Sequence, residues 1–260
     1  MRLDEFLFTN KYFDSRTKAK QAIERKEIYV NDKLVTKSSF NIDENISYSI
    51  SIKAETSFVS LGGYKLQKAL SDFDFNVSNL VCADIGSSTG GFTDCLLKNG
   101  AKKVFAVDLN DDLLHDSLKK DDRVIRIIKN AKLLTSVDFD DEIDFLCADL
   151  SFISATMVLP IFNNLLTENS HIVLLIKPQF EYDKKKKFKN GIIRDKSIQK
   201  DACYKVINCA KENGFCPLNI ITAPLDKEKN VEYLILLKKQ DNISQNSNSS
   251  FEKIISDFKF

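Results

Sequence analysis

Long apolar runs are missing from this chain of 260 residues. Hydrophobic residues make up 43% of it, yet no stretch approaches the roughly 18 consecutive apolar residues that a membrane-spanning helix needs. The opening residues, MRLDEFLFTN, are interrupted by Asp4 and Glu5, so they lack the apolar centre of a signal peptide. We therefore expect a cytoplasmic protein without an integral membrane partner.

Cysteine pairs at metal-binding or redox spacing are also missing. The six cysteines form no C-x-x-C motif, and several lie in apolar segments, where a reduced thiol behaves as a small hydrophobic side chain. This usage is typical of a reducing compartment. The two histidines, His115 and His171, are predicted to be surface or strand-start residues, and no cluster has the spacing of metal ligands. We expect no metal site.

The chain has little net charge. It holds 38 basic and 37 acidic residues, a formal charge of +1, so the chain as a whole does not indicate a polyanionic partner. The charges are nevertheless unevenly spread. Residues 11–37 contain eight basic and four acidic side chains, a local balance of +4. A basic face is therefore predicted near the N-terminus of a nearly neutral protein.

Residues 81–94, VCADIGSSTGGFTD, combine an apolar run, a glycine-rich turn and the start of a helix-like segment. A dinucleotide-binding turn of the form G-x-G-x-x-G would need glycine in place of Ser88, and no Gly-Lys-Ser/Thr follows, which excludes a P-loop. What remains is acid-x-Gly-x-x-x-Gly, formed by Asp84, Gly86 and Gly90. This turn resembles the first motif of S-adenosylmethionine-dependent methyltransferases, although any strand-to-helix turn can carry two glycines.

The next strand is predicted at KVFAVDL and ends in Asp108, where a carboxylate can accept hydrogen bonds from both hydroxyls of a ribose. The resemblance implies S-adenosyl-L-methionine as the cofactor. The residues expected to bind it lie in the turn and at the ends of the following strands, and they are Asp84, Gly86, Ser87, Ser88, Thr89, Gly90, Gly91, Phe92, Asp108, Asn130 and Asp149.

Strand-like and helix-like segments alternate from residue 80 to residue 238. This alternation predicts an α/β fold, a Rossmann-like domain with a mainly parallel, doubly wound sheet and helices on both faces. We assign residues 58–240 to this domain, residues 1–57 to a small α+β domain and residues 241–260 to a disordered tail. The polar stretch KAETS is the expected linker. The basic segment 184–195 is either a flexible lid or a solvated insertion.

Ligands of a doubly wound sheet bind outside the carboxyl ends of its strands, and Asp149 and Lys177 both follow predicted strands there. These residue types suit methyl transfer to a ribose 2′-OH, because a lysine whose pKa is lowered by burial can take the hydroxyl proton while a carboxylate orients it. With Lys65 and Glu232 they resemble the K-D-K-E tetrad of FtsJ-like ribose 2′-O-methyltransferases, which implies that all four are catalytic. Taken singly, each of these four residues could instead be a charged side chain with a structural role only.

The first 57 residues contain two helix-like segments and a short strand. Leu3 and Leu7 share a helical face, Ser15 can cap a second helix, and IYVND predicts a strand that ends in a turn. This order resembles the S-four (alpha-L) RNA-binding domain, although Asp32 replaces the usual glycine, which should loosen the turn. A solvated, charged helix pair is the alternative. The residues expected to contact RNA phosphates are Arg2, Arg16, Lys18, Lys20, Arg25, Lys33 and Lys37.

Five strings follow the order found in the TlyA family, haemolysin-labelled proteins that join an S-four domain to an FtsJ-like methyltransferase: GGYKL, DIGSSTGGFTD, DLSFIS, KPQFE and NVEYL. The resemblance covers residues 1–238. It implies an S-adenosylmethionine-dependent cytidine-2′-O-methyltransferase whose partners are ribosomal RNA and ribosomal subunits. Leu61 stands where the family commonly has arginine. The competing interpretations are a membrane-active haemolysin and an RNA-binding protein with an inactive methyltransferase fold.

Overall fold

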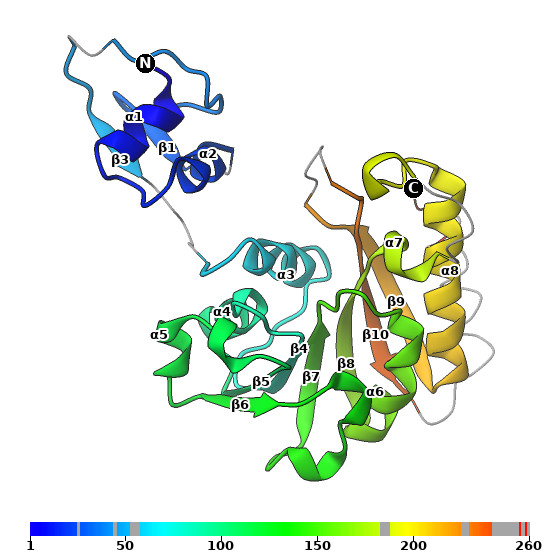
Figure 1. Ribbon diagram of the computed structural model, residues 1–260. Helices are drawn as coiled ribbons and strands as arrows, with labels where there is room; N and C mark the ends of the chain where they lie inside the picture. The colour runs from blue at the N-terminus through cyan, green and yellow to red at the C-terminus, as the bar shows by residue number, and fades with distance from the viewer. Residues whose placement is uncertain are drawn as a thin grey trace. The chain divides into compact units, whose positions relative to one another are not determined.

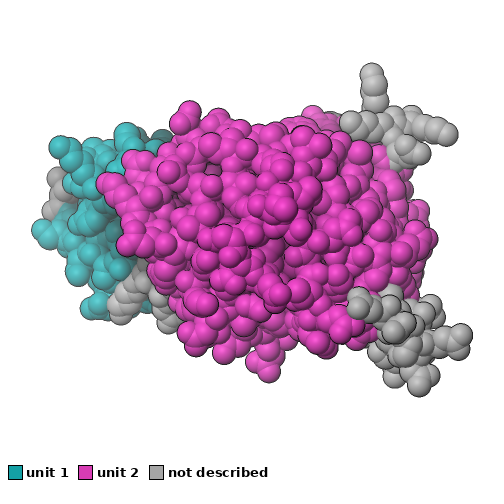
Figure 2. Space-filling view, turned by 90° about the horizontal axis from the view of Figure 1, so that it is seen from below, with its two compact units in different colours: residues 1–57 teal, residues 58–260 magenta. Residues whose placement is uncertain are grey.

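A computed structural model of the chain describes residues 1–24, 27–43, 46–52, 58–182, 188–224 and 229–240, together with Ile255 and Phe258. The chain folds into two compact units, residues 1–57 and 58–260, which are coloured separately in Figure 2. Each unit has its own hydrophobic core. Arg25, the linker KAETS, the lysine run 184–187 and most of the tail lie outside the described residues.

The first unit packs two helices against a small antiparallel sheet of order β2-β1-β3. The helical prediction is confirmed, since Ser15 Oγ accepts a hydrogen bond from the Lys18 amide at 3.2 Å and the apolar face of the second helix is buried. The elements are α1 (Leu3–Thr9), α2 (Arg16–Glu24), β1 (Ile28–Val30), β2 (Lys33–Leu34) and β3 (Ile50–Ile52).

The turn between β1 and β2 keeps its shape without glycine. Asn31 and Asp32 both adopt positive φ angles, 50° and 59°, as a two-residue hairpin of the twisted type requires. The Asn31 side chain accepts a hydrogen bond from the Ser49 amide at 2.9 Å, and its own amide donates to the Ser49 carbonyl at 2.8 Å. The turn thus keeps a regular hairpin geometry with Asp32 in place of glycine, and Ser49, which directly precedes β3, holds it through Asn31.

The second unit contains a seven-stranded sheet of order β6-β5-β4-β7-β8-β10-β9, in which β10 alone runs opposite to the other six strands (Figure 1). The predicted mainly parallel α/β fold is confirmed. The strands are β4 (Val81–Ile85), β5 (Lys103–Asp108), β6 (Val124–Ile128), β7 (Ile143–Ala148), β8 (Leu166–Ile176), β9 (Phe215–Thr222) and β10 (Tyr233–Lys239).

Helices cover both faces of this sheet (Figure 1). Successive strand residues point to opposite sides, so Ala83 and Leu174 pack with α6 and α8, whereas Cys82 and Val173 pack with α3 and α4. The helices are α3 (Gly62–Asp72), α4 (Gly91–Lys98), α5 (Asp116–Lys119), α6 (Leu159–Leu165), α7 (Pro178–Glu181) and α8 (Lys196–Glu212). Short 3-10 turns are η1 (Asp111–Leu113), η2 (Ala131–Leu133), η3 (Ser136–Asp138), η4 (Ala155–Met157) and η5 (Lys189–Gly191).

One edge of the sheet gathers the predicted site. The parallel strands β4, β5, β7 and β8 all end there, and the reversed strand β10 begins there. Asp149 follows β7 directly, Lys177 follows β8, and Glu232 precedes β10. Since Tyr233 pairs with Ile176 across β10 and β8, the register brings Glu232 and Lys177 to neighbouring strand ends.

Two residues of the C-terminal segment pack against the second unit. Ile255 is 1% exposed within the core that also holds α8, and Phe258 packs against the same core. The Phe258 ring lies 5.8 Å from the Tyr233 ring in an edge-on arrangement. These two residues have a defined position, because the amphipathic end of the predicted tail supplies apolar side chains that the core can bury.

Candidate active site

The glycine-rich turn between β4 and α4 has a backbone that other residues could not adopt without strain. Gly86 has a φ of +87° and Gly90 a φ of +89°. A Cβ at Gly86 would lie 2.7 Å from the carbonyl oxygen of Asp149, and one at Gly90 would lie 2.2 Å from a methyl carbon of Leu118. Gly86 therefore allows the turn to pass close to Asp149 at the end of β7, and Gly90 allows it to pass close to Leu118 of α5. Ser87 is buried in this turn, whereas Ser88 and Thr89 are exposed.

Asp84 lies beneath this turn and is fully buried. Its Oδ2 accepts hydrogen bonds from the Thr93 amide at 2.8 Å and the Thr93 hydroxyl at 2.6 Å, which ties β4 to α4. Its Oδ1 is buried and has no partner within the described part of the chain. Burial raises the pKa of Asp84 to about 7, assisted by the charges of Asp149 and Asp108 and opposed by the bonds from Thr93.

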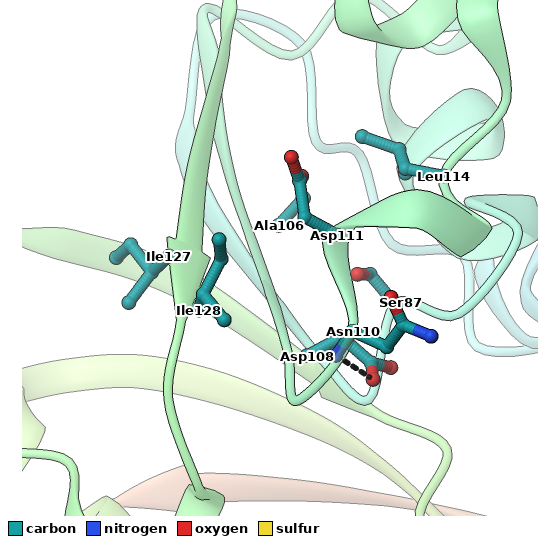
Figure 3. A pocket seen from close by; sticks show the side chains of 8 residues that line it. All are labelled: Ser87, Ala106, Asp108, Asn110, Asp111, Leu114, Ile127 and Ile128. Carbon is teal, nitrogen blue, oxygen red and sulfur yellow. Dashed lines mark hydrogen bonds between the residues drawn. The ribbon is translucent and has the colours of Figure 1, made fainter.

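A hollow opens beside the turn, at the ends of β5 and β6. Figure 3 shows polar and apolar side chains around it, namely Ser87, Ala106, Asp108, Asn110, Asp111, Leu114, Ile127 and Ile128. The Asp108 carboxylate accepts hydrogen bonds from the Ser88 amide at 2.8 Å and the Asn110 amide at 3.2 Å. Each oxygen keeps a further lone pair, so hydroxyl groups can still bind there. The mixed lining suits a nucleoside, with its ribose at Asp108 and its base against the apolar residues.

The other predicted cofactor residues have structural contacts of their own. Asn130 follows β6, and its side chain accepts a hydrogen bond from the Lys132 amide at 3.0 Å. Phe92 is 3% exposed and belongs to the core between α3 and α4. A Cβ at Gly91 would lie 2.9 Å from the Gly63 amide, so these glycines allow the two helices to approach closely. A direct cofactor contact by these residues stays a prediction.

Four charged side chains from four segments form a chain of ion pairs at the sheet edge. Lys177 Nζ lies 2.6 Å from Asp149 Oδ1, and Lys65 Nζ lies 3.7 Å from Asp149 Oδ2. Lys65 Nζ also donates to Glu232 Oε2 at 2.6 Å. The structure therefore brings the predicted tetrad together in the order Glu232, Lys65, Asp149, Lys177. Lys65 stands in the first turn of α3, where the helix dipole disfavours a cation, and the two carboxylates account for its presence.

The two lysines of the tetrad differ in their surroundings. Burial by itself would lower the pKa of Lys65, but Asp149 and Glu232 outweigh it and raise that pKa above its ordinary value. Lys65 is thus held as an ammonium ion between two carboxylates. Lys177 is 8% exposed, and besides Asp149 its Nζ donates to Ser151 Oγ at 2.8 Å. Lys177 therefore pairs with one carboxylate, whereas Lys65 pairs with two.

Comparison with protein families agrees with this geometry. Residues 58–240 match the profile described as FtsJ-like methyltransferase, and residues 1–45 match the profile described as S4 domain. The chain belongs to the FtsJ-like methyltransferase family. The resemblance predicted from the sequence motifs is confirmed for both parts of the chain.

Relatives of this FtsJ-like methyltransferase carry two kinds of name. Hemolysin A of Brachyspira hyodysenteriae is 41% identical over 241 residues, which is 90% of this chain and 98% of that protein. The 16S/23S rRNA (cytidine-2′-O)-methyltransferase TlyA of Mycobacterium tuberculosis is 32% identical, over 92% of this chain and 90% of that protein. A solved structure of a hemolysin-labelled protein from Streptococcus thermophilus superposes with a TM-score of 0.72 at 33% identity, over 98% of this chain and 94% of that one. Among the described residues of this chain, no helix is long and apolar enough to cross a membrane.

The structure adds residues that sequence reasoning missed around the tetrad of this FtsJ-like methyltransferase. Ser151 is a hydrogen-bond partner of Lys177. Phe152 is 92% exposed, has a φ of +64°, and its ring lies 5.3 Å from the ring of Phe180. The Lys177 ammonium lies 5.8 Å from the centre of the Phe180 ring. The string DLSFIS contains both Ser151 and Phe152, and an aromatic residue three positions after Asp149 is the sequence feature that could have indicated them.

In the first unit, several residues of the predicted RNA-binding face are engaged in ion pairs. Arg2 and Arg16 each place a guanidinium nitrogen 3.0 Å from the buried carboxylate of Asp4. Lys18 pairs with the exposed carboxylate of Asp14 at 2.7 Å. Arg16 therefore links α2 to α1, and Arg2 holds the start of α1, in addition to any contact with RNA.

Three further lysines of that face, Lys20, Lys33 and Lys37, are exposed. Lys20 lies 3.7 Å from Glu24 one helical turn away. Lys33 and Lys37, on the hairpin and just after it, make no ion pair within the described residues. Arg25 lies outside the described part of the chain. Lys33 and Lys37 are thus the residues of this set whose charges are most available to a phosphate backbone.

Proposed function

We propose that this chain transfers a methyl group from S-adenosyl-L-methionine to a ribose 2′-OH of ribosomal RNA, at a cytidine. The ion-pair chain of Lys65, Asp149, Lys177 and Glu232, beside the glycine-rich turn, is the observation that carries the proposal. The similarity to TlyA of Mycobacterium tuberculosis along most of both chains supports the choice of ribosomal subunits as the RNA partner. The S4 domain match supports RNA as the substrate.

The residues at the sheet edge fit S-adenosylmethionine, which supplies an electrophilic methyl group when bound. Gly86 leaves room where a Cβ would strike the Asp149 backbone, and Asp108 keeps lone pairs for ribose hydroxyls beside the hollow. The buried, unpartnered Oδ1 of Asp84 lies under the same turn and can accept a further hydrogen bond. We infer that the turn and the hollow hold the donor, and that the tetrad faces the acceptor.

Within the tetrad, the electrostatics divide the roles of the two lysines. The proton of the attacking hydroxyl passes to Lys177 Nζ, which must be neutral at that moment. Lys177 Nζ donates a hydrogen bond to Ser151 Oγ and lies 2.6 Å from Asp149 Oδ1, so these two side chains fix the direction of its remaining lone pair. Lys65 remains an ammonium ion between Asp149 and Glu232 and stabilises the negative charge that develops on the ribose oxygen.

RNA is held outside the tetrad. Phe152 offers an exposed ring beside Phe180, whose own ring lies near the Lys177 ammonium, and a base taken out of a single-stranded or unpaired region can stack on such a ring. Lys33 and Lys37 of the first unit can contact phosphates, which adds affinity without sequence specificity. We infer that the first unit supplies RNA affinity and the second unit supplies the chemistry.

The test is methyl transfer from S-adenosylmethionine carrying a labelled methyl group to purified ribosomal subunits. The wild-type protein should label ribosomal RNA, and Lys177→Arg should bind the cofactor but transfer no label, because its guanidinium group cannot take the hydroxyl proton. RNA binding without cofactor binding or label would indicate a non-catalytic RNA-binding protein. Lysis of red cells by purified protein that does not bind S-adenosylmethionine would favour the membrane-active alternative.

A further inference from the structure

One buried carboxylate near the site takes no part in the tetrad. Glu181 is the last residue of α7 and is 4% exposed. Its Oε2 accepts a hydrogen bond from Ser154 Oγ at 2.5 Å, and its Oε1 accepts one from the Ala155 amide at 2.7 Å. Burial raises the pKa of Glu181, while these two hydrogen bonds and Lys205 act in the opposite direction. Both carboxylate oxygens therefore accept hydrogen bonds from the segment that follows Asp149.

These contacts join the two loops that carry the central ion pair. Asp149 opens the loop 149–154, which ends at Ser154, the residue that donates to Glu181. Lys177 immediately precedes α7, whose last residue is Glu181. The two segments are thus joined twice: the ion pair of Lys177 and Asp149 joins their first residues, and the hydrogen bonds of Glu181 join their last.

The tip of the loop has few contacts of its own, since Ser151 is exposed and Phe152 is 92% exposed. Leu150 and Ile153 on either side of the tip are partly buried and pack against the core, so the loop has apolar contacts as well as the hydrogen bonds of Glu181. Glu181 is itself held by α8, because Lys205 of that helix donates a hydrogen bond to the Glu181 carbonyl oxygen at 2.8 Å. Helix α7 lies beside α8 (Figure 1). A buried acceptor of defined length thus connects the loop to the core of the domain.

We propose that Glu181 is a positioning residue that fixes the separation between the Asp149 carboxylate and the Lys177 ammonium. This inference rests on the proposed catalytic role of the tetrad. Length matters more than charge for such an anchor. A glutamine at position 181 can accept from the Ala155 amide and donate to Ser154 Oγ, whereas aspartate keeps the charge but is one methylene too short to reach both donors.

The experiment compares Glu181→Gln and Glu181→Asp, with Ser170→Ala as the matched control. Ser170 is 4% exposed and donates to the Ile143 carbonyl at 2.9 Å near the opposite end of β8, so its truncation removes a buried hydrogen bond away from the site. Glu181→Asp should lower kcat by about 10- to 100-fold, because a displacement of about 1 Å can cost that much, with KM for RNA and Kd for the cofactor within about twofold of wild type. Glu181→Gln should keep kcat within about threefold.

Hydrogen–deuterium exchange supplies a readout that needs no activity. Amides of residues 149–157 should exchange faster in Glu181→Asp than in wild type, Glu181→Gln or Ser170→Ala. Wild-type kcat with unchanged exchange in Glu181→Asp would overturn the inference, as would equal loss of kcat in Ser170→Ala or in Glu181→Gln. If the wild-type protein transfers no methyl group, the proposed function fails, and faster exchange in Glu181→Asp would still show that Glu181 holds the loop.

Discussion

Replacement of Lys177 by arginine separates proton transfer from charge. Lys177 is 8% exposed and lies 2.6 Å from Asp149 Oδ1, so its removal would leave a carboxylate near the core with only the more distant Lys65. Arginine preserves the positive charge opposite Asp149, but a guanidinium group does not give up its proton at usable pH. The folded state and the binding of cofactor should therefore survive in Lys177→Arg, whereas the chemical step should not.

The size of the loss follows from the role of a general base. Such a group contributes a factor of about 10² to 10⁴ to the rate. At about 1.36 kcal/mol for each factor of ten, this corresponds to about 2.7 to 5.4 kcal/mol of barrier. Because the group acts in the transition state, kcat should fall by this factor while KM changes little.

Single-turnover methyl transfer to ribosomal RNA is the assay, with cofactor affinity measured by calorimetry. Lys65→Arg is the matched control, since Lys65 is held as an ammonium ion by Asp149 and Glu232 and needs only its charge. Lys65→Arg should lose much less activity than Lys177→Arg. Near wild-type turnover in Lys177→Arg would refute the assignment of the base, and Lys65 would then be the next candidate.

Three further predictions concern other parts of the chain. Gly86→Val should abolish cofactor binding in calorimetry, because its side chain would strike the Asp149 backbone. Gly191 also has a positive φ, but a Cβ there would meet no atom within 4 Å, so Gly191→Val should bind the cofactor normally. Equal affinity of the two variants would contradict the role given to the turn. Lys33→Ala and Lys37→Ala should each weaken ribosomal RNA binding and reduce its salt slope by about 1, and unchanged slopes would place the RNA elsewhere. Burial raises the pKa of Asp84 to about 7, so the folded protein keeps a proton that the unfolded chain releases above about pH 4, and stability against urea should fall from about pH 4 to 7. Asp84→Asn should flatten that fall, and an identical pH dependence of both proteins would show that Asp84 does not titrate in this range.

Local signals in the sequence were sufficient for the fold and for two residues of the tetrad. Alternation of apolar runs with helical periodicity predicts the sheet, and the rule that ligands bind at carboxyl strand ends places Asp149 and Lys177. Glu232 is different, because its position depends on β10 running against its neighbours, which no local pattern reveals. There the resemblance to a known tetrad supplied what periodicity could not.

Long-range contacts explain what the sequence did not predict. The polar segment 111–120 divides into η1 and α5 because the His115 side chain caps the second element, and nothing in the spacing of its apolar residues indicates this break. Glu181 and Ser154 lie 27 residues apart, so their hydrogen bond leaves no trace in the spacing of motifs. Arg2 and Arg16 were assigned to RNA because they are basic, whereas the fold brings both to Asp4. In each case a polar side chain has a partner that only the tertiary structure identifies.

The most direct test of the central claim is the chemical position of the methyl group. Ribosomal subunits would be incubated with the purified protein and labelled S-adenosylmethionine, and the product would be mapped by methods that distinguish 2′-O-methyl from base methylation. We predict label on a ribose 2′-oxygen of a cytidine, present with wild-type protein and absent with Lys177→Arg. Label on a base, or equal labelling by both proteins, would contradict the account.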